Sequence, residues 1–365
     1  MNRSKELIKK ISSNIDAVFI TSVENRRYFS LCDIHTGYLL ITRQILYYIV
    51  DFRYYEIAVK EVLKSKNPNL KVVFSKDLKI TLKELITENN IKRIVIEREN
   101  LIVSESEKIY SLFSFLKVDI AVNAQLDDEI SNMRFVKSIY EIEKMKRSQQ
   151  ITENAFNYIV QKIKPGISEK DIALDIEFHM RKNGASSVAF DLIVISGEKT
   201  SLPHGTPGDR KICENEFLIM DMGAVFEGYH SDMTRTVAIG DVSDEQKKIY
   251  NIVLQAQLEA IETLKDGVKA GDVDKAARDV INSHGYAKYF GHSTGHGVGL
   301  KVHEAPKLSI SSEEKLKSNA VVTIEPGIYL PGKFGVRIED MLLVKKDGCE
   351  NFTNITKELI CLNKF

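Results

Sequence analysis

Four acidic side chains are the residues of this sequence best suited to chemistry, and they fall in pairs on two expected β-hairpins. They are Asp221, Asp232, Glu325 and Glu339. Like charges that face each other across paired strands repel and weaken the pairing, and ionised carboxylates are costly to bury without compensation. Divalent cations held between the hairpins would remove both penalties. The pattern therefore predicts a dinuclear metal site, with metal-assisted hydrolysis as its chemistry.

The expected turns define how the acids are arranged. The first hairpin is expected at residues 217–239, with its turn centred between Phe226 and Glu227, midway between the two aspartates. The second is expected at residues 321–344, with its turn at residues 331–333, midway between the two glutamates. We therefore expect each acid to lie directly opposite its partner.

Histidines concentrate between the two hairpins. Of the eight in the chain, three lie within twelve residues of glycine-rich sequence: His292, His296 and His303. Imidazole is a common neutral partner for carboxylates at a divalent ion and a common proton carrier. His204 lies apart in a turn-rich loop, which suits the rim of a pocket. The remaining four lack such a context and are expected to be structural or at the surface: His35, His179, His230 and His284.

Glycines alternate through the histidine segment, at Gly295, Gly297 and Gly299. They superficially resemble a nucleotide-binding loop. However, no strong strand pattern comes directly before them and no helix-opening pattern follows, so a phosphate cradle is disfavoured. Glycines that let the backbone crowd a metal-bound ligand explain the run better.

Composition describes an ordinary globular protein without strong charge bias. The 365 residues contain 51 Lys and Arg against 51 Asp and Glu, so the formal net charge is zero. This balance gives no electrostatic reason to expect a nucleic-acid or membrane partner. The N-terminus lacks the pattern of a signal peptide, no stretch is long and apolar enough to span a membrane, and the four cysteines form no CxxC pair. We therefore expect a cytoplasmic protein.

The first third of the chain alternates between strand-like and helix-like stretches, which favours an α/β layer fold. The expected strands are residues 17–21, 37–42, 46–50, 71–74, 93–96 and 118–121. The expected helices are residues 54–63, 82–88 and 105–116. The acidic stretch 123–134 is expected to be the boundary, so the domains are placed at residues 1–125 and 133–365.

The second domain contains a weak internal sequence repeat with an offset of 101 residues. The sequence 163–167 resembles 264–268, and the same offset relates Gly184 to Gly285. Each copy is expected to contain two helices followed by an acidic hairpin. Two similar halves related by a pseudo-twofold axis would bring both hairpins to one shared site.

Together these residues resemble the pita-bread metallopeptidases, in the branch of aminopeptidase P and Xaa-Pro dipeptidase (prolidase). In the second domain the resemblance rests on an ordered set of motifs: Ser196-Gly197, Pro203-His204-Gly205, Asp221-Met222-Gly223, Ser231-Asp232-Met233-Thr234-Arg235-Thr236, Gly291-His292, Gly295-His296-Gly297-Val298-Gly299, Val302-His303-Glu304, Thr323-Ile324-Glu325-Pro326-Gly327 and Val336-Arg337-Ile338-Glu339-Asp340. Residues 25–30 and 50–54 resemble the creatinase N-terminal domain more weakly. The implied fold is a creatinase-like α/β domain followed by a pseudo-twofold α+β catalytic domain.

The resemblance also implies a ligand set and a cofactor. Five residues would hold two divalent ions: Asp221, Asp232, His296, Glu325 and Glu339. Asp232 and Glu339 would bridge the ions. Manganese is the common choice in the family, with cobalt or zinc possible, and an oxygen-rich set with one imidazole suits Mn(II).

The implied reaction is hydrolysis of the peptide bond before proline, in a dipeptide or at the N-terminus of a longer peptide. Glu325 would act as general base and then pass its proton to the proline nitrogen. His204, His292 and His303 would line the pocket, and the last two would contact the scissile carbonyl. Arg337 could hold a ligand or substrate carboxylate, and Tyr329 and Arg235 are weaker candidates for substrate binding.

Other readings of the same scaffold remain open at this stage. A methionine aminopeptidase shares the five ligands but generally lacks a comparable N-terminal domain, and a creatinase-like hydrolase works without metal ligands. A catalytically silent binding module on this scaffold would have lost ligands. The resemblance further implies a homodimer, and it does not distinguish a dipeptidase from an aminopeptidase acting on longer peptides.

Overall fold

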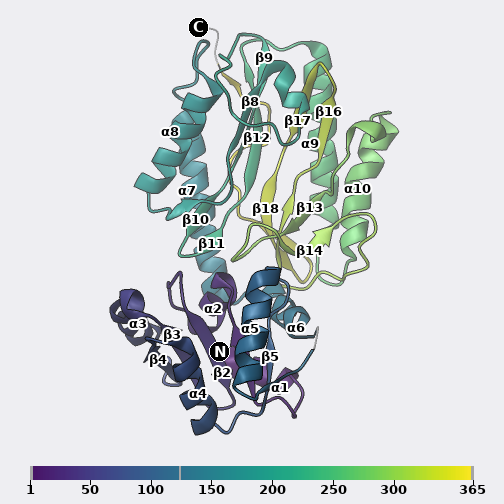
Figure 1. The fold of residues 1–365 in the computed structure, drawn as a ribbon. Coiled ribbons are helices and arrows are strands. Elements are labelled where there is room, and N and C mark those ends of the chain that lie inside the picture. Colours follow the sequence, from purple (N-terminus) through teal and green to yellow (C-terminus); the bar gives the residue numbers. More distant parts are fainter. Residues whose placement is uncertain (1–2, 123–124, 363–365) are drawn as a thin grey trace. The chain divides into compact units, whose positions relative to one another are not determined.

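The computed structural model describes residues 3–122 and 125–362 (Figure 1). Two compact units make up the chain, Met1–Met133 and Arg134–Phe365. Each unit has its own buried apolar core. Within the two described stretches, no helix is long and apolar enough to cross a membrane.

A six-stranded sheet forms the centre of the first unit, in the order β4-β3-β2-β1-β5-β6. Strand β2 runs antiparallel to both of its neighbours, and the other pairings are parallel. The strands are β1 (Ala17–Ile20), β2 (Tyr38–Thr42), β3 (Leu46–Val50), β4 (Leu70–Phe74), β5 (Arg93–Ile96) and β6 (Asp119–Ile120). Strands β1 and β3 are buried along their whole length, as expected for apolar runs covered on both faces.

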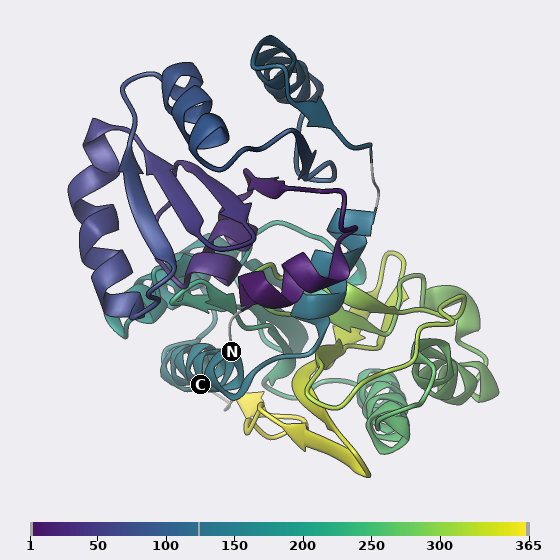
Figure 2. The same cartoon turned by 90° about the horizontal axis from the view of Figure 1, so that it is seen from below.

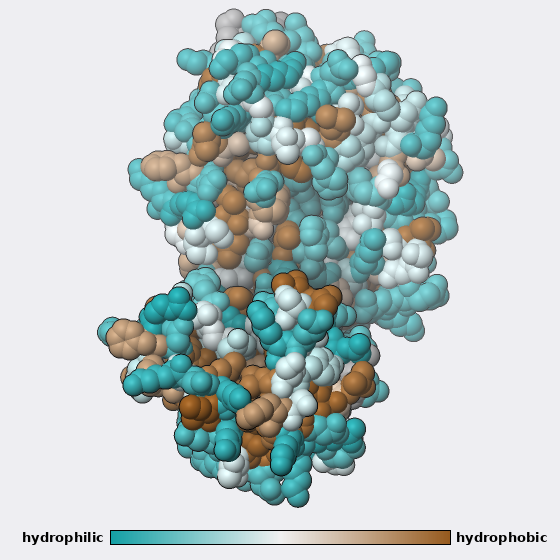
Figure 3. All heavy atoms as spheres, viewed as in Figure 1, coloured by the Kyte–Doolittle hydropathy of each residue, from teal (hydrophilic) through white to brown (hydrophobic). Residues whose placement is uncertain are grey.

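Helices connect and cover these strands, so the expected α/β layer fold is confirmed. They are α1 (Arg3–Lys10), α2 (Val23–Ser30), α3 (Phe52–Ser65), α4 (Leu78–Glu88) and α5 (Val103–Phe115). Helices α3 and α4 begin earlier than the apolar pattern suggests, because Asp51 and Asp77 cap their first turns. The sequence interpretation missed α1 and α2. Large apolar side chains remain exposed in this unit, among them Phe52, Leu63 and Val103. Hydrophobic residues are visible on the surface of the first unit (Figure 3).

The stretch expected to be a polar boundary is instead a helix, α6 (Gln125–Phe135). Its Leu126, Ile130 and Met133 are buried. These positions follow the i, i+4, i+7 spacing of one helical face. The acidic residues between them obscured this stripe, and the two compact units divide inside the helix.

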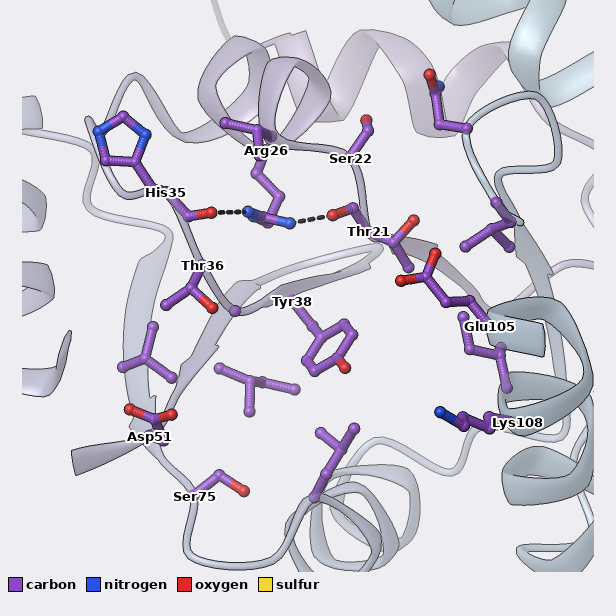
Figure 4. Close-up of a pocket in the computed structure, with 18 of the residues that line it drawn as sticks. Thr21, Ser22, Arg26, His35, Thr36, Tyr38, Asp51, Ser75, Glu105 and Lys108 are labelled. Atoms are coloured by element: carbon purple, nitrogen blue, oxygen red, sulfur yellow. Dashed lines mark hydrogen bonds between the residues drawn. The ribbon is translucent and has the colours of Figure 1, made fainter. Parts of the chain in front are cut away.

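A cavity of about 560 Å³ lies in the first unit, where the parallel strands β1, β3 and β4 end (Figure 4). Arg26 lines it but is fully engaged by the protein. Its guanidinium donates to Thr21 O, to His35 O and to the Tyr48 hydroxyl. None of the five expected metal ligands lines this cavity.

The second unit is built from two similar halves. The first contains α7 (Ile139–Ile159), α8 (Glu169–Lys182) and a sheet in the order β20-β12-β9-β8. The second contains α9 (Asp244–Thr263), α10 (Ala270–Ser283) and a sheet in the order β14-β13-β15-β18-β19. Helices α9 and α10 pack against each other (Figures 1 and 2).

The strands of this unit are mostly buried, and several are very short. They are β7 (Ser187–Val188), β8 (Ile193–Ser196), β9 (Glu216–Met222), β10 (Ala224–Phe226), β11 (Tyr229–His230), β12 (Met233–Ile239), β13 (Gly295–Gly297), β14 (Glu304–Leu308), β15 (Val321–Ile324), β16 (Gly327–Leu330), β17 (Phe334–Arg337), β18 (Asp340–Lys345), β19 (Gly348–Asn351) and β20 (Cys361–Leu362). A short helical turn, η1 (Gly197–Ser201), follows β8.

Matching turns confirm the internal repeat. Gly166 and Gly267 both have positive φ angles, of 92° and 81°. Gly184 and Gly285, which follow the second helix of each half, have φ angles of 105° and 82°. A residue with a Cβ is strained in this region of φ/ψ space, so glycine is required at the same point of both copies.

The turn of the first acidic hairpin lies one residue later than expected, which shifts the pairing across the strands by two residues. Phe226 pairs with Tyr229 across a two-residue turn, and Asp221 therefore faces Thr234 rather than Asp232. Glu227 and Gly228 form the turn with φ angles of 48° and 81°, which fits a type I′ hairpin. The expectation that Asp221 and Asp232 lie directly opposite each other is wrong. They are diagonal neighbours, and because side chains alternate along a strand they keep the same face.

The second acidic hairpin has its expected register. Tyr329 pairs with Gly335 in the tip, and Ile324 pairs with Asp340 at the base. Both pairings are symmetric about Gly332, as the sequence predicted. Glu325 and Glu339 lie between the two pairs of strands, where the regular ladder is interrupted.

Alternating glycines in the histidine segment allow β13 to approach its neighbours closely, which explains them without a phosphate. A Cβ on Gly297 would lie 2.2 Å from Ala305 O, and one on Gly295 would lie 2.0 Å from Thr323 O. We therefore predict that Gly297→Ala lowers the free energy of unfolding by at least about 1–3 kcal/mol, because the backbone must shift. Urea denaturation of the metal-free protein measures this change.

Gly291→Ala is the matched control for that substitution. A Cβ at Gly291 meets no atom within 4 Å. The expected change in stability is within about 0.5 kcal/mol. Equal losses in the two variants would show that close approach is not the reason for Gly297.

Candidate metal centre

Both halves of the second unit contribute to one cluster of acids. Asp221 lies in β9 and Asp232 directly precedes β12, whereas Glu325 follows β15 and Glu339 precedes β18. His296 lies at the centre of β13. The three residues Asp221, Asp232 and Glu339 are buried, at 9%, 4% and 2% exposure. The pseudo-twofold arrangement thus brings the five expected ligand residues to one place.

Distances within the cluster suit a shared ion. The His296 Nε2 atom lies 3.6 Å from Asp232 Oδ2 and 3.4 Å from Glu325 Oε1. Ligand atoms of Asp232, His296 and Glu339 lie within 4.8 Å of one another. Asp221 joins the cluster electrostatically, since its charge raises the pKa values of Asp232, Glu325 and Glu339.

In the absence of cations, burial and neighbouring carboxylates favour the protonated forms of Asp232, Glu325 and Glu339. Burial raises the pKa of Asp232 and of Glu339 well above the usual range, and neighbouring carboxylates raise both further. Burial likewise raises the pKa of Glu325 to about 7, although Arg337 opposes this shift and Asp221 adds to it. The site therefore favours positive charge among the carboxylates.

The ring of His296 is oriented as a ligand. Its Nδ1 atom lies 3.1 Å from Gly297 O. A carbonyl can only accept, so Nδ1 carries the proton and Nε2 presents its lone pair toward Asp232 and Glu325. Burial also lowers the pKa of His296, which keeps the ring neutral. This lone pair is repelled by ionised carboxylates unless a proton or a metal ion lies between them.

An unsatisfied oxygen supports the same conclusion. Asp221 Oδ1 is buried and has no hydrogen-bond partner among the described residues, which is costly for a carboxylate oxygen. Its other oxygen accepts a hydrogen bond of 2.7 Å from Arg337. The residues present therefore fit divalent metal ions: four carboxylates, one neutral imidazole and an oxygen with free acceptor capacity.

Arg337 connects the acids to the edge of the site. Its Nε donates to the Thr234 hydroxyl at 3.0 Å, and its Nη1 donates to the Tyr329 hydroxyl at 2.9 Å and to Pro203 O at 3.1 Å. Nη2 donates to Asp221, so each of the three guanidinium nitrogens has an acceptor in the protein. Arg337 therefore makes the expected contact with a ligand carboxylate, that of Asp221. Through Pro203 O it also holds the loop that carries His204.

His292 is held by both of its ring nitrogens. Nδ1 lies 2.9 Å from Ser293 O, and Nε2 lies 2.9 Å from the Tyr329 hydroxyl. Burial lowers the pKa of His292 to about 4, so the ring is neutral. Nδ1 then donates to Ser293 O, and Nε2 accepts from Tyr329, whose oxygen already accepts from Arg337.

His204 and His303 are exposed. The ring of His303 packs edge-on against His296, with centroids 4.4 Å apart. His204 lies close enough to lower the pKa values of His292 and His303. All four predicted histidines therefore gather around the acids: His292 and His296 are partly buried, and His204 and His303 are exposed.

Two threonines belong to the site and were missed. The Thr234 hydroxyl donates to Glu339 Oε2 at 2.7 Å. The Thr323 hydroxyl lies 3.4 Å from Glu325 Oε1 and accepts a hydrogen bond of 3.1 Å from the backbone N–H of His296. Thr234 follows Asp232 by two residues and Thr323 precedes Glu325 by two, so the strand period of two was the available signal.

Arg235, a weaker candidate, serves the fold instead. Its Nη2 contacts Asp340 Oδ1 at 2.8 Å, and its other donors reach backbone carbonyls, including Glu339 O. Lys357 contacts the second oxygen of Asp340. This buried ion pair holds the β12 and β18 strands from the face opposite the acids.

Sequence comparison identifies the relationship. Residues 143–346 match the metallopeptidase family M24, and residues 3–136 match the creatinase/prolidase N-terminal domain. The chain belongs to metallopeptidase family M24. It is therefore a metallo-exopeptidase that uses divalent metal ions.

Other M24 proteins resemble it along nearly their whole length. An Xaa-Pro dipeptidase of Pyrococcus horikoshii is 38% identical and aligns with 99% of this chain and 100% of its own. The structure of an Xaa-Pro dipeptidase from Bacillus anthracis has a TM-score of 0.91 at 38% identity, covering 99% of both chains. The structure of an X-Pro aminopeptidase from Thermotoga maritima has a TM-score of 0.88 at 40% identity, covering 98% of this chain and 99% of that one.

The acids predict how stability of the metal-free protein depends on pH. Glu325 has its pKa raised from 4.5 to about 7, so between these values the folded protein holds a proton that the unfolded chain releases. The free energy of unfolding should therefore fall as pH rises from about 5 to 7, by up to about 1.4 kcal/mol per pH unit for each such proton. Urea denaturation in the presence of a chelator measures the slope.

Glu325→Gln should reduce this slope by the share of one proton, because position 325 then has no carboxyl proton to lose, whereas Asp232 and Glu339 keep theirs. Mn(II) should stabilise the wild-type protein more at pH 8 than at pH 5, because binding needs ionised ligands. A metal-free protein whose stability rises from pH 5 to 7 would contradict the assigned pKa shifts.

Proposed function

We propose that this chain hydrolyses the peptide bond between an N-terminal residue and proline, in a reaction that depends on two divalent ions. The observation that carries the proposal is the cluster of four carboxylates, three of them buried, with the lone pair of His296 facing it. The named relatives are Xaa-Pro dipeptidases and an X-Pro aminopeptidase, which supports the substrate class. The domain placed at residues 133–365 would carry the catalysis.

Five residues would hold the ions: Asp221, Asp232, His296, Glu325 and Glu339. Asp232 and Glu339 are the most deeply buried of the five. Mn(II) is the proposed metal, with Co(II) or Zn(II) as alternatives. When bound, the ions would supply the positive charge that polarises a carbonyl and makes water nucleophilic near neutral pH.

Glu325 would move the proton. Its carboxyl group sits beside the Thr323 hydroxyl, and its pKa of about 7 in the metal-free protein reflects how strongly this environment retains a proton. In the proposed reaction Glu325 takes the proton of the attacking water and delivers it to the proline nitrogen.

The histidines would meet the substrate on the open side. His303 is exposed and keeps a ring nitrogen available for the scissile carbonyl. Neutral His292 has both nitrogens engaged, so its contact with the carbonyl requires Tyr329 to turn away. His204 would line the rim, and the remaining capacity of Arg337 and Tyr329 would receive the substrate carboxylate.

We further propose that the protein is a cytoplasmic homodimer that binds neither nucleic acid nor membranes. A formal net charge of zero gives no electrostatic reason for binding to nucleic acid or to an anionic membrane. Analytical ultracentrifugation tests the dimer directly.

Mn(II)-loaded protein should cleave Ala-Pro or Ala-Pro-Ala and leave Ala-Ala and Ala-Ala-Ala intact. Preference between the dipeptide and the tripeptide distinguishes a dipeptidase from an aminopeptidase. Methionine release from Met-Ala-Ala, creatine hydrolysis, or metal binding without any hydrolysis would instead identify the three alternatives on this scaffold.

Asp232→Asn should lose Mn(II) and reduce kcat/KM by more than about 100-fold, because loss of a direct ligand exceeds the usual effect of an outer partner. Metal analysis and peptide hydrolysis measure both quantities. The matched control is Glu227→Gln at the hairpin turn, whose surface ion pair with Lys144 lies away from the acids. Hydrolysis at the wild-type rate by the Asp232→Asn variant would overturn the metal assignment.

A further inference from the structure

Helix α10 carries an ion pair, built on a buried carboxylate, that the proposed chemistry does not use. Asp274 is fully buried, and Arg278 lies one turn later on the same helix. The Arg278 Nε donates to Asp274 Oδ2 at 2.5 Å, and its Nη2 donates to Oδ1 at 3.2 Å. Burying the charge of Asp274 is costly, so the contacts of this pair with other parts of the chain are informative.

The pair holds the segment that leads from α10 into β13. Asp274 Oδ1 accepts both the N–H and the hydroxyl of Thr294, each at 2.9 Å. Arg278 donates to Phe290 O at 3.1 Å and also to His292 O. Residues 290–294 are thus fixed at both ends and in the middle by two side chains of one helix.

This segment touches the site at two points. The side chain of His292 reaches the Tyr329 hydroxyl and through it Arg337. The backbone carbonyl of Thr294 accepts the Glu325 N–H at 2.7 Å. Thr294 therefore lies between Asp274 and the proposed general base.

The other half of the unit contains a similar arrangement, in which a buried helix carboxylate holds a neighbouring loop. Glu169 in α8 is fully buried and accepts the N–H and the hydroxyl of Ser196 at 2.8 and 3.0 Å. Its second oxygen accepts from Lys199 at 2.6 Å and from the Gly208 N–H at 3.1 Å. Ser196 and Gly208 flank the loop that carries His204.

The two carboxylates are not equivalent positions of the repeat, since the offset of 101 relates Glu169 to Ala270 rather than to Asp274. The same arrangement has therefore been reached from different positions in each half. It consists of a helix carboxylate, a Ser or Thr that donates twice, and a cation that fixes the following loop. Such a recurrence favours a role in the shared site over a role in packing alone.

We propose that Asp274, together with Arg278, is a positioning residue for the metal centre, setting the places of His292 and Glu325. The proposal rests on the proposed function for its effect on catalysis. Its effect on metal binding needs only that Glu325 is a ligand. Outer partners of this kind typically change metal affinity or activity by about 10–100-fold.

Asp274→Ala should weaken Mn(II) binding by about 10–100-fold and lower kcat by a similar factor, with a smaller change in KM. Electron paramagnetic resonance of free Mn(II) gives the affinity, and hydrolysis of Ala-Pro by fully metal-loaded protein gives kcat and KM. The ¹⁵N shifts of the His292 ring should also move. Asp274→Asn keeps an acceptor for Thr294 and should lie between Asp274→Ala and the wild type.

Glu177→Gln is the matched control. Glu177 and Arg181 form an exposed i, i+4 pair on α8, and Arg181 also donates to a loop carbonyl, that of Ser186. This variant should retain wild-type affinity, kcat and ring shifts. All measurements are made well below the melting temperature of each variant, on protein with native near-ultraviolet circular dichroism.

A purely structural role would lower the melting temperature of Asp274→Ala while the folded protein kept wild-type Mn(II) affinity, kcat and His292 shifts, and this result would overturn the inference. If the wild-type protein cleaves no Xaa-Pro peptide but Asp274→Ala still weakens Mn(II) binding and moves the His292 shifts, the positioning role stands and the proposed function fails.

Discussion

Repulsion within a cluster of four carboxylates, three of them buried, is the constraint on which the second unit depends. Burial and neighbouring carboxylates raise the pKa values of Asp232, Glu325 and Glu339, and Arg337 brings a single guanidinium against the cluster. A fold that gathers such groups without cations would lose stability at neutral pH. The surrounding structure is best understood as a frame that holds these charges together until metal ions replace the protons.

The frame works because each half places its acids on one face of a strand pair. Alternation along the strands sends Asp232 and Thr234 to the same side, and Thr323 and Glu325 likewise. Arg235 follows Thr234 and Asp340 follows Glu339, so both point to the other side, where they form their own ion pair. Strands β12 and β18 therefore separate two charged clusters: the acids on one side, and the ion pair of Arg235 with Asp340 on the other.

Much of this arrangement could be predicted from sequence because it follows local rules. The second hairpin kept its register, and the capping boxes at Ser138 and Ser243 start their helices. The turn of the first hairpin lies one residue later than predicted, and its pairing differs by two residues, because Gly228 selects the turn. The midpoint of the two aspartates cannot show this preference.

Interactions between distant parts of the sequence account for what was missed. Nothing local connects Asp274 with Thr294, or Arg337 with Pro203, and only the folded chain brings them into contact. Helix α6 was missed for a different reason, since its buried stripe is masked by acidic neighbours.

The last strand of the unit affects the order in which the protein can be completed. Strand β20 pairs in parallel with β12, joining Ala238 to Cys361. The sheet of the first half therefore lacks an edge strand until the ribosome has passed the entire second half. A nascent chain holding only the two aspartates has neither their partner acids nor a closed sheet, so metal capture becomes one of the final events of biogenesis.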